Sequence, residues 1–175
     1  QGSATSSQAP HRIDVDTLNT IKSNNDGGIY AYVLSDGEAH VNGTAAITVT
    51  GFAGGAGIKL FAQEGLSDAD LYLGDTGGGY SGAIVMTVSG DGINATANGA
   101  GEISIKTTAT ADISGAGLFN GIFARNANTA TSGDIKIDAA GDIGTSGSGA
   151  DRSGIYADIT NLLNGANISI TSSGD

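Results

Sequence analysis

The sequence predicts an all-β fold: a parallel β-helix, or β-solenoid, of about five to six coils with three short strands per coil. The first observation is a near-repeat, in which GEISIK at 101–106 returns as GDIKID at 133–138 and as NISIT at 167–171. The second is a Gly-Ile-aromatic-Ala motif at 121–124 and 154–157, between those copies. Two strand patterns that repeat in phase, 32 to 33 residues apart, indicate stacked coils rather than a compact two-layer domain.

Less regular copies extend the same pattern towards the N-terminus. The Gly-Ile motif recurs at Gly28, Gly57 and Gly92. We expect the companion strand at 13–15, 47–49 and 84–88, before the three Ile-x-Ile copies, and a third strand at 39–41, 71–73, 112–113 and 142–143. Because the Gly-Ile spacing varies between 29 and 35 residues, loops of different length are expected to leave some corners of the coil.

The repeated isoleucines are the expected core, because alternate side chains of a strand point to one side, here the interior of the coil. Stacking places Ile103, Ile135 and Ile168 in one file, and Ile105, Ile137 and Ile170 in another. Burying one Ile stabilises by about 1.5–3 kcal/mol, so the stack as a whole forms the core. On the outside, Lys106 is expected beside Asp138 and Arg125 beside Asp158.

Composition limits the class of protein and its partners. Glycine is abundant (30 of 175 residues), but the β-branched residues form short alternating runs that a disordered chain lacks. The net charge of −11 disfavours binding to nucleic acid and to anionic membrane surfaces. The chain has no cysteine and no run of 18 apolar residues, so we expect no disulfide, no zinc–thiolate site and no membrane insertion by this segment.

We expect a single structural unit with a short leader. Residues 1–11 lack the basic and apolar regions of a signal peptide and are expected to be a flexible lead-in. Residues 12–175 are expected to form one solenoid segment of a longer chain, in which neighbouring coils cover the strand that ends near Asp175.

The repeats also resemble a known class of protein. Coils that combine Gly-Asp-Ile-x-Ile with Gly-Ile-Tyr/Phe-Ala, rich in Gly, Asn, Thr and Ser and free of Cys, resemble the passenger domains of bacterial autotransporters. The stretch GDIKIDAAGDI at 133–143 is similar to the haemagglutinin-type repeats of secreted adhesins. The resemblance is strongest over 101–175 and implies a right-handed parallel β-helix, usually without catalysis in the coils. It also implies a secreted or cell-surface protein, anchored to the outer membrane through a C-terminal region outside these residues.

Five aromatic side chains on the Gly-Ile strands are the candidate binding residues: Tyr30, Tyr32, Phe61, Phe123 and Tyr156. An exposed aromatic strip can bind sugars or partner proteins, whereas rings covered by the variable loops would only contribute packing. We expect a structural and adhesive segment that presents loops and an outer sheet face to a host-surface protein or a glycan. We expect no catalysis, no metal and no cofactor.

Two other functions stay open. One is a polysaccharide lyase or hydrolase, which would need paired carboxylates beside a basic residue. The candidates are Asp14 with Asp16, Asp68 with Asp70, and Arg12 or Lys22, although a solvated outer face explains the same residues. The other is an inert stalk spacer whose length is its function.

Overall fold

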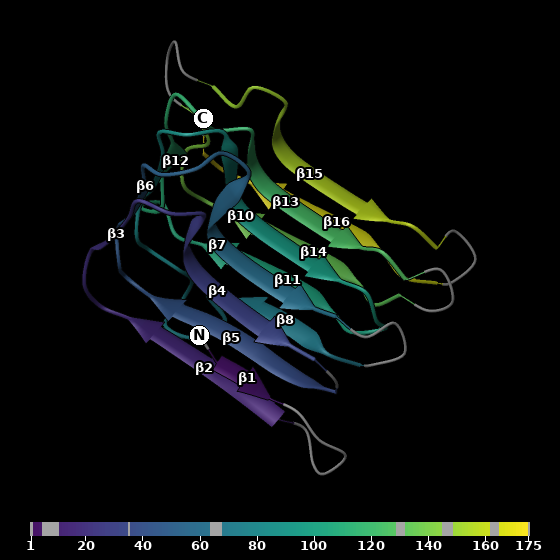
Figure 1. Cartoon of the computed structure of the whole chain (residues 1–175). Coiled ribbons are helices and arrows are strands. Elements are labelled where there is room, and N and C mark those ends of the chain that lie inside the picture. The colour runs from purple at the N-terminus through teal and green to yellow at the C-terminus, as the bar shows by residue number, and fades with distance from the viewer. Residues whose placement is uncertain are drawn as a thin grey trace.

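The computed structural model describes residues 2–4, 11–34, 36–63, 68–128, 132–144, 149–161 and 165–174. Within these ranges every regular element is a β-strand, and the strands run parallel in three sheets that stack coil upon coil (Figure 1). None of the described segments forms a helix long and apolar enough to cross a membrane. The three sheets enclose one continuous apolar core, so the fold is a parallel β-solenoid with three strands per coil.

Sheet A contains all five Gly-Ile motifs. Its strands, in spatial order, are β1 (Gly2–Ala4), β4 (Gly27–Val33), β7 (Gly55–Ala62), β10 (Gly90–Ala97), β13 (Asn120–Asn126) and β15 (Ser153–Ile159). The motif isoleucines pair in one register from Ile29 to Ile155. The predicted alignment of the motif is therefore confirmed across all its copies.

Sheet B contains the Ile-x-Ile strands. Its strands, in spatial order, are β16 (Ile168–Ser172), β14 (Ile135–Ala139), β11 (Ile103–Thr107), β8 (Asp70–Leu73), β5 (Gly37–Gly43) and β2 (His11–Thr17). Ile103 pairs with Ile135 and Ile135 with Ile168, and the isoleucines two positions later pair in the same way. The register of both predicted files is therefore confirmed, as is the pairing of Lys106 with Asp138, whereas Ile168 and Ile170 on the last strand are 43% and 47% exposed rather than buried.

Sheet C is the shortest of the three. Its strands are β12 (Ile113–Ser114), β9 (Ile84–Met86), β6 (Ile47–Val49) and β3 (Ile21–Ser23). Ile143 extends the sheet by one residue, through a parallel bridge to Ile113.

Four of the predicted strand assignments are wrong, because the prediction interchanges sheets B and C in two of the early coils. Residues 47–49 and 84–86 lie in sheet C, whereas 39–41 and 71–73 lie in sheet B beneath 103–105. Both kinds of triplet bury two apolar side chains, so burial pattern alone does not distinguish them. The spacing along the sequence does distinguish them. Residues 84 and 103 are only 19 positions apart, which is less than one coil, so they cannot belong to neighbouring strands of the same sheet.

The coil count is slightly lower than expected. Four coils are complete, from β2–β3–β4 to β11–β12–β13. A further turn contains β14, the Ile143 bridge and β15, and β16 follows it. The expected flexible lead-in at 1–11 contains β1, which pairs with β4, and the start of β2.

Glycine in the Gly-Ile motif allows sheets A and C to approach each other. A Cβ atom added at Gly92 would lie 2.7 Å from the carbonyl oxygen of Gly121 and closer still to Cγ2 of Ile113 in sheet C. The same contacts recur one coil at a time, with Gly28 against Ile47, Gly57 against Ile84, and Gly121 against Ile143. In these four copies the motif glycine is thus required by a close approach that has no room for a side chain.

Candidate functional site

The five predicted aromatic residues all lie on the outer face of sheet A. In β4 the side chains of Ile29, Ala31 and Val33 are buried, and those of Tyr30 and Tyr32 alternate with them and point outward. The register places Tyr30 in a file with Lys59, Asn94, Phe123 and Tyr156, and Tyr32 in a file with Phe61, Thr96, Arg125 and Asp158. Whether these residues bind a ligand stays a prediction.

Three of the aromatic residues form a group on the first two coils. The rings of Tyr32 and Phe61 stack with centroids 5.4 Å apart and planes at 1°, and Tyr30 lies 5.9 Å from Tyr32. Nζ of Lys59 lies 5.3 Å from the centroid of Tyr30 and 5.8 Å from that of Phe61, within cation–π range. We call Tyr30, Tyr32, Phe61 and Lys59 the first aromatic group. Tyr30 is its most exposed ring, at 40%.

The other two aromatic residues form a separate pair on the last coils. Phe123 and Tyr156 stack at 5.1 Å with planes at 3°, beside the predicted ion pair between Arg125 Nε and Asp158 Oδ2 at 3.2 Å. Between the two groups lies β10, where Asn94 and Thr96 occupy the equivalent outward positions. The structure therefore divides the expected strip into two patches separated by one polar coil.

The first aromatic group borders a pocket of about 460 Å³. The pocket lies at the corner where sheet C passes into sheet A, on the first two coils. It is lined by Asn25, Asp26, Gly27, Gly28, Ile29, Tyr30, Ala53, Gly54, Gly55, Ala56 and Lys59. An aromatic ring, an ammonium group, a carboxylate and an amide thus meet around one concave surface with glycine-rich walls.

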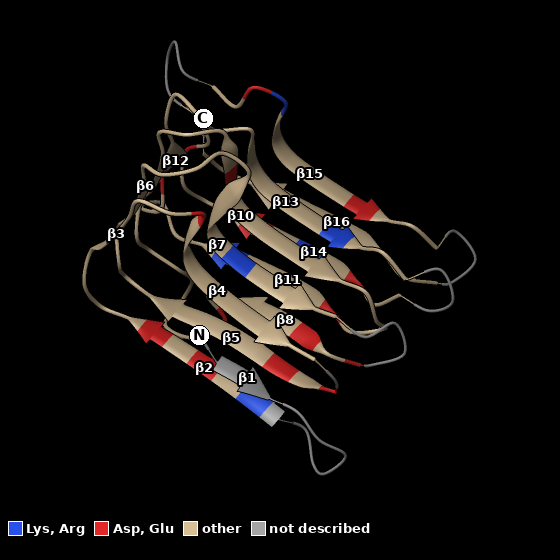
Figure 2. Ribbon diagram, viewed as in Figure 1, with Lys and Arg blue, Asp and Glu red and all other residues tan. Residues whose placement is uncertain are grey.

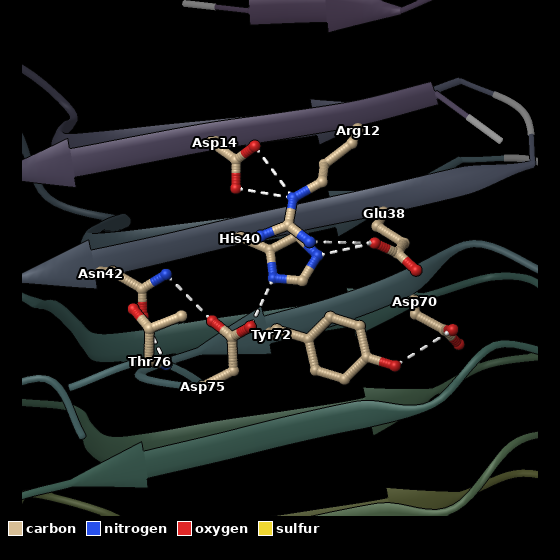
Figure 3. A network of polar contacts seen from close by, with 9 residues as sticks. All are labelled: Arg12, Asp14, Glu38, His40, Asn42, Asp70, Tyr72, Asp75 and Thr76. Carbon is tan, nitrogen blue, oxygen red and sulfur yellow. Dashed lines mark hydrogen bonds and ion pairs between the residues drawn. The ribbon is translucent and has the colours of Figure 1, made fainter. Parts of the chain in front are cut away.

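A second constellation lies on the outer face of sheet B, where acidic residues gather on β2, β5 and β8 (Figure 2). At its centre is His40, whose side chain is only 5% exposed. Its Nε2 atom lies 2.9 Å from Oε2 of Glu38, and its Nδ1 atom lies 2.7 Å from Oδ2 of Asp75 (Figure 3). The ring of Tyr72 stacks on the imidazole at 4.8 Å.

Asp75 belongs to the loop after β8 and connects that loop to β5. Its other oxygen accepts a hydrogen bond from Nδ2 of Asn42 at 2.9 Å, and the amide of Thr76 donates to Oδ1 of Asn42 at 3.2 Å. Partial burial alone would raise the pKa of Asp75, but the hydrogen bonds from Asn42 and His40 outweigh it and lower that pKa. We call Glu38, His40, Asn42 and Asp75 the histidine–carboxylate cluster.

The histidine–carboxylate cluster fastens the loop after β8 to the outer face of β5. Both imidazole nitrogens of His40 lie within hydrogen-bond distance of a carboxylate, one from β5 itself and one from the loop. The cluster was missed in the sequence because Asp75 contacts His40 across 35 residues, and only the correct sheet assignment brings them together.

One residue of each carboxylate pair proposed for an enzyme contacts a hydrogen-bond donor of the protein. Asp14 accepts from Nε of Arg12 at 2.8 Å, with both side chains about half exposed. Oδ1 of Asp70 accepts from the amide of Glu102 at 2.6 Å, and its Oδ2 from the hydroxyl of Tyr72 at 3.2 Å. Among the residues that the structure describes, no group of three His, Asp or Glu side chains is arranged to hold a metal ion.

No family model, curated protein or solved structure matches this chain. The function therefore has to be argued from the two aromatic patches, the pocket and the cluster themselves.

The pKa shifts predict opposite effects of acid at Asp75 and Asp70. The lowered pKa of Asp75 means that this carboxylate stabilises the fold above its unfolded pKa of about 3.9, and that this stability is lost as the pH falls through the folded pKa. Burial raises the pKa of Asp70, so its charge costs stability at neutral pH, and acid relieves that cost as the pH falls through the folded pKa towards the unfolded pKa of about 3.9.

Two isosteric variants test this difference in urea unfolding between pH 2.5 and 7. Asp75→Asn should lose about 1–3 kcal/mol at pH 7, because the neutral amide lacks the charge that strengthens the contacts with Asn42 and His40, and its stability should fall less below pH 4. Asp70→Asn should lose little at pH 7, since its oxygen still accepts from Glu102 and its NH₂ can donate to Tyr72. Equal losses at pH 7 would show that the cluster has no special role.

Proposed function

We propose that this chain is a structural and adhesive module: a rigid solenoid that presents the outer face of sheet A to a glycan. The observation that carries the proposal is the first aromatic group beside the 460 Å³ pocket. A pocket of this size is within the range of about 300–1,000 Å³ typical of small-ligand sites. The face of Tyr30 offers a stacking surface for a sugar ring, and Asn25, Asp26 and Lys59 offer hydrogen-bonding groups around it.

The rigidity of the scaffold supports a display function. The outward side chains are placed by strands whose backbones pair on both sides through most of the stack, so the aromatic rings are held in a fixed array. The resemblance of the repeats to autotransporter passengers and haemagglutinin-type adhesins supports display on, or release from, a bacterial surface. In that setting the partner is a glycan or a glycoprotein of a host or of another bacterium.

The two other functions have less support. A polysaccharide-degrading enzyme requires a carboxylate pair that is free to act on the substrate, whereas Asp14, Asp70 and Asp75 are each engaged by protein donors. An inert spacer does not need an aromatic group of four residues beside a pocket. The same binding experiment separates all three functions.

The experiment is a screen of oligosaccharides by glycan array, followed by calorimetric titration of the best ligand. Tyr30→Ala should weaken binding about three- to tenfold, because it removes the most exposed ring of the first aromatic group. Tyr156→Ala is the matched control, since this ring is similarly exposed (36%) but belongs to the distant pair, and it should leave the affinity unchanged. Absence of binding to any glycan would contradict the proposal, and release of new reducing ends would indicate the enzyme.

A further inference from the structure

We propose that the pocket beside Tyr30 is one end of a longer groove, and that this groove binds a linear, uncharged oligosaccharide along the stacking axis of the coils. The proposal rests on the glycan-binding function proposed above and extends it from a single sugar to a chain. A second cavity, of about 290 Å³, lies at the same corner between sheets C and A. It is lined by Gly54, Gly55, Ser89, Gly90, Asp91 and Phe119.

The two cavities meet at Gly54 and Gly55, which line both of them. An added Cβ at Gly55 would overlap the carbonyl oxygen of Asp26, so no larger residue fits at this position. At Gly54, where φ is +96°, an added Cβ would meet no atom within 4 Å. The junction is therefore a backbone surface with no side chain to divide the space, and the two cavities are continuous across it. We call them together the corner groove.

The corner groove crosses four coils, from the coil of β4 to that of β13. Backbone hydrogen bonds connect its corner from one coil to the next, with Ala56 donating to the carbonyl of Asp26, Gly54 to that of Ser89, and Phe119 to that of Gly90. Neighbouring coils are about 4.8 Å apart, so the three steps from β4 to β13 span about 14 Å. A single sugar is too short to bridge this distance, whereas an extended chain that lies lengthwise can contact both ends.

Each end of the corner groove has an aromatic ring with a cation beside it. At one end Tyr30 is 40% exposed, and Nζ of Lys59 lies 5.3 Å from its ring centroid. At the other end Phe119 is 36% exposed, and Cζ of Arg152 lies 5.6 Å from its ring centroid. An aromatic ring offers a stacking surface to the apolar face of a sugar, and a cation can donate hydrogen bonds to the sugar hydroxyls. The two ends therefore suit two sugars of the same chain.

The charged groups along the corner groove favour an uncharged chain. Among the described residues that line it, Asp26 and Asp91 supply two carboxylates and Lys59 supplies one ammonium group. The two oxygens of Asp91 accept hydrogen bonds from Nδ2 of Asn94 and of Asn120, both at 2.7 Å, which fixes this carboxylate in position. Each oxygen keeps a lone pair that can accept from a sugar hydroxyl. An anionic polysaccharide would instead be repelled by these carboxylates and by the net charge of −11.

Calorimetric titration with oligosaccharides of increasing length tests the proposal. The probes are cello-, xylo- and N-acetylated chito-oligosaccharides of two to six units, which are uncharged, extended chains. In at least one series the affinity should rise about tenfold or more with length and then level off, because a chain that reaches both rings links two contacts in one ligand. Maltohexaose, a curved chain, and hexagalacturonate, an anionic one, should bind about tenfold more weakly than the best hexasaccharide.

Variants at the second ring show whether the far end of the corner groove is used. Phe119→Ala should weaken binding of the hexasaccharide about three- to tenfold and leave that of the disaccharide unchanged, because the larger cavity beside Tyr30 holds the shorter ligand. Tyr30→Ala should weaken both. Phe119→Leu, which keeps an apolar side chain without the ring, should act like Phe119→Ala at less risk to folding.

The matched control is Phe123→Ala, which removes a partly exposed ring of the distant pair that lines neither cavity and should change neither affinity. Circular dichroism and thermal melting check that each variant is folded.

The outcomes separate the corner groove from the proposed function. An affinity that does not depend on length, binding of array glycans but of none of the three series, a preference for maltohexaose or hexagalacturonate, or no selective effect of the folded Phe119 variants on the hexasaccharide would each overturn the groove. If Tyr30→Ala still weakens binding of a glycan in any of these cases, the proposed function stands. Absence of binding to any glycan would overturn both.

Discussion

Replacing Ile135 by alanine is expected to lower the free energy of unfolding by about 2–5 kcal/mol. Ile135 is fully buried, and its neighbours in the file, Ile103 and Ile168, pair with it on both sides. Truncation removes a core side chain and leaves a cavity that the rigidly spaced coils cannot close. Urea unfolding followed by circular dichroism measures the loss.

Ile168→Ala is the control for this prediction. It is the same substitution in the same file, one coil further on, at a side chain that is 43% exposed. Less apolar surface is buried there and solvent fills the space, so the loss should be less than about half of that for Ile135→Ala. Equal losses would mean that the stack is not the core.

Replacing Gly92 by alanine is expected to destabilise the fold by about 1–3 kcal/mol or more, although alanine normally favours ordered structure over glycine. The added methyl group would overlap Cγ2 of Ile113 and the backbone carbonyl of Gly121. The pairing of β10 with β13 fixes the position of this carbonyl. The overlap can therefore be relieved only if the backbone shifts and this pairing is locally disturbed.

The same substitution at Gly154 provides the control within the same motif. An added Cβ there meets only Cγ2 of Ile143, at 3.9 Å, an ordinary contact. Gly154→Ala should therefore be close to neutral, as measured by the same urea titration. A large loss at Gly154, or none at Gly92, would contradict the close approach of sheets A and C as the reason for the motif glycine.

The regular part of the solenoid could be predicted from the sequence because each repeated residue has a local physical cause. The Gly-Ile motif marks sheet A in every coil, since the isoleucine packs towards the core and the glycine of the first four copies is required by the close approach of sheet C. The strands of the early coils were harder to assign to their sheets. There the strand of sheet B buries Ala39 and Val41, whereas the strand of sheet C buries Ile47 and Val49 and so looks more like the later Ile-x-Ile copies. Residue composition therefore favoured 47–49 over 39–41 as the strand of sheet B, and only the pairing between coils distinguishes the two.

The candidate sites were predictable to different degrees. Strand alternation placed Tyr30 and Phe61 on one outer face, but the polar interruption at Asn94 followed only from the register. The pocket beside Tyr30 depends on the path of the corner loops, which the repeat does not specify. The contact between His40 and Asp75 likewise depends on a loop that folds back over the preceding coil.

The most direct test of the three-sheet solenoid is disulfide trapping between neighbouring coils, which is clean because the chain contains no cysteine. Paired positions on adjacent strands lie about 4.8 Å apart, within the Cα separation of about 4.4–6.8 Å that a disulfide requires. Tyr72 pairs with Ser104 in sheet B, and Val85 pairs with Ser114 in sheet C.

Mild oxidation of dilute double-cysteine variants, read by mass spectrometry, should therefore give an intramolecular disulfide in two cases. These are Tyr72→Cys with Ser104→Cys and Val85→Cys with Ser114→Cys. The third variant, Val85→Cys with Ser104→Cys, joins different sheets and should remain reduced. Cross-linking of Val85 to Ser104, with none between Tyr72 and Ser104, would contradict the solenoid described by the structure.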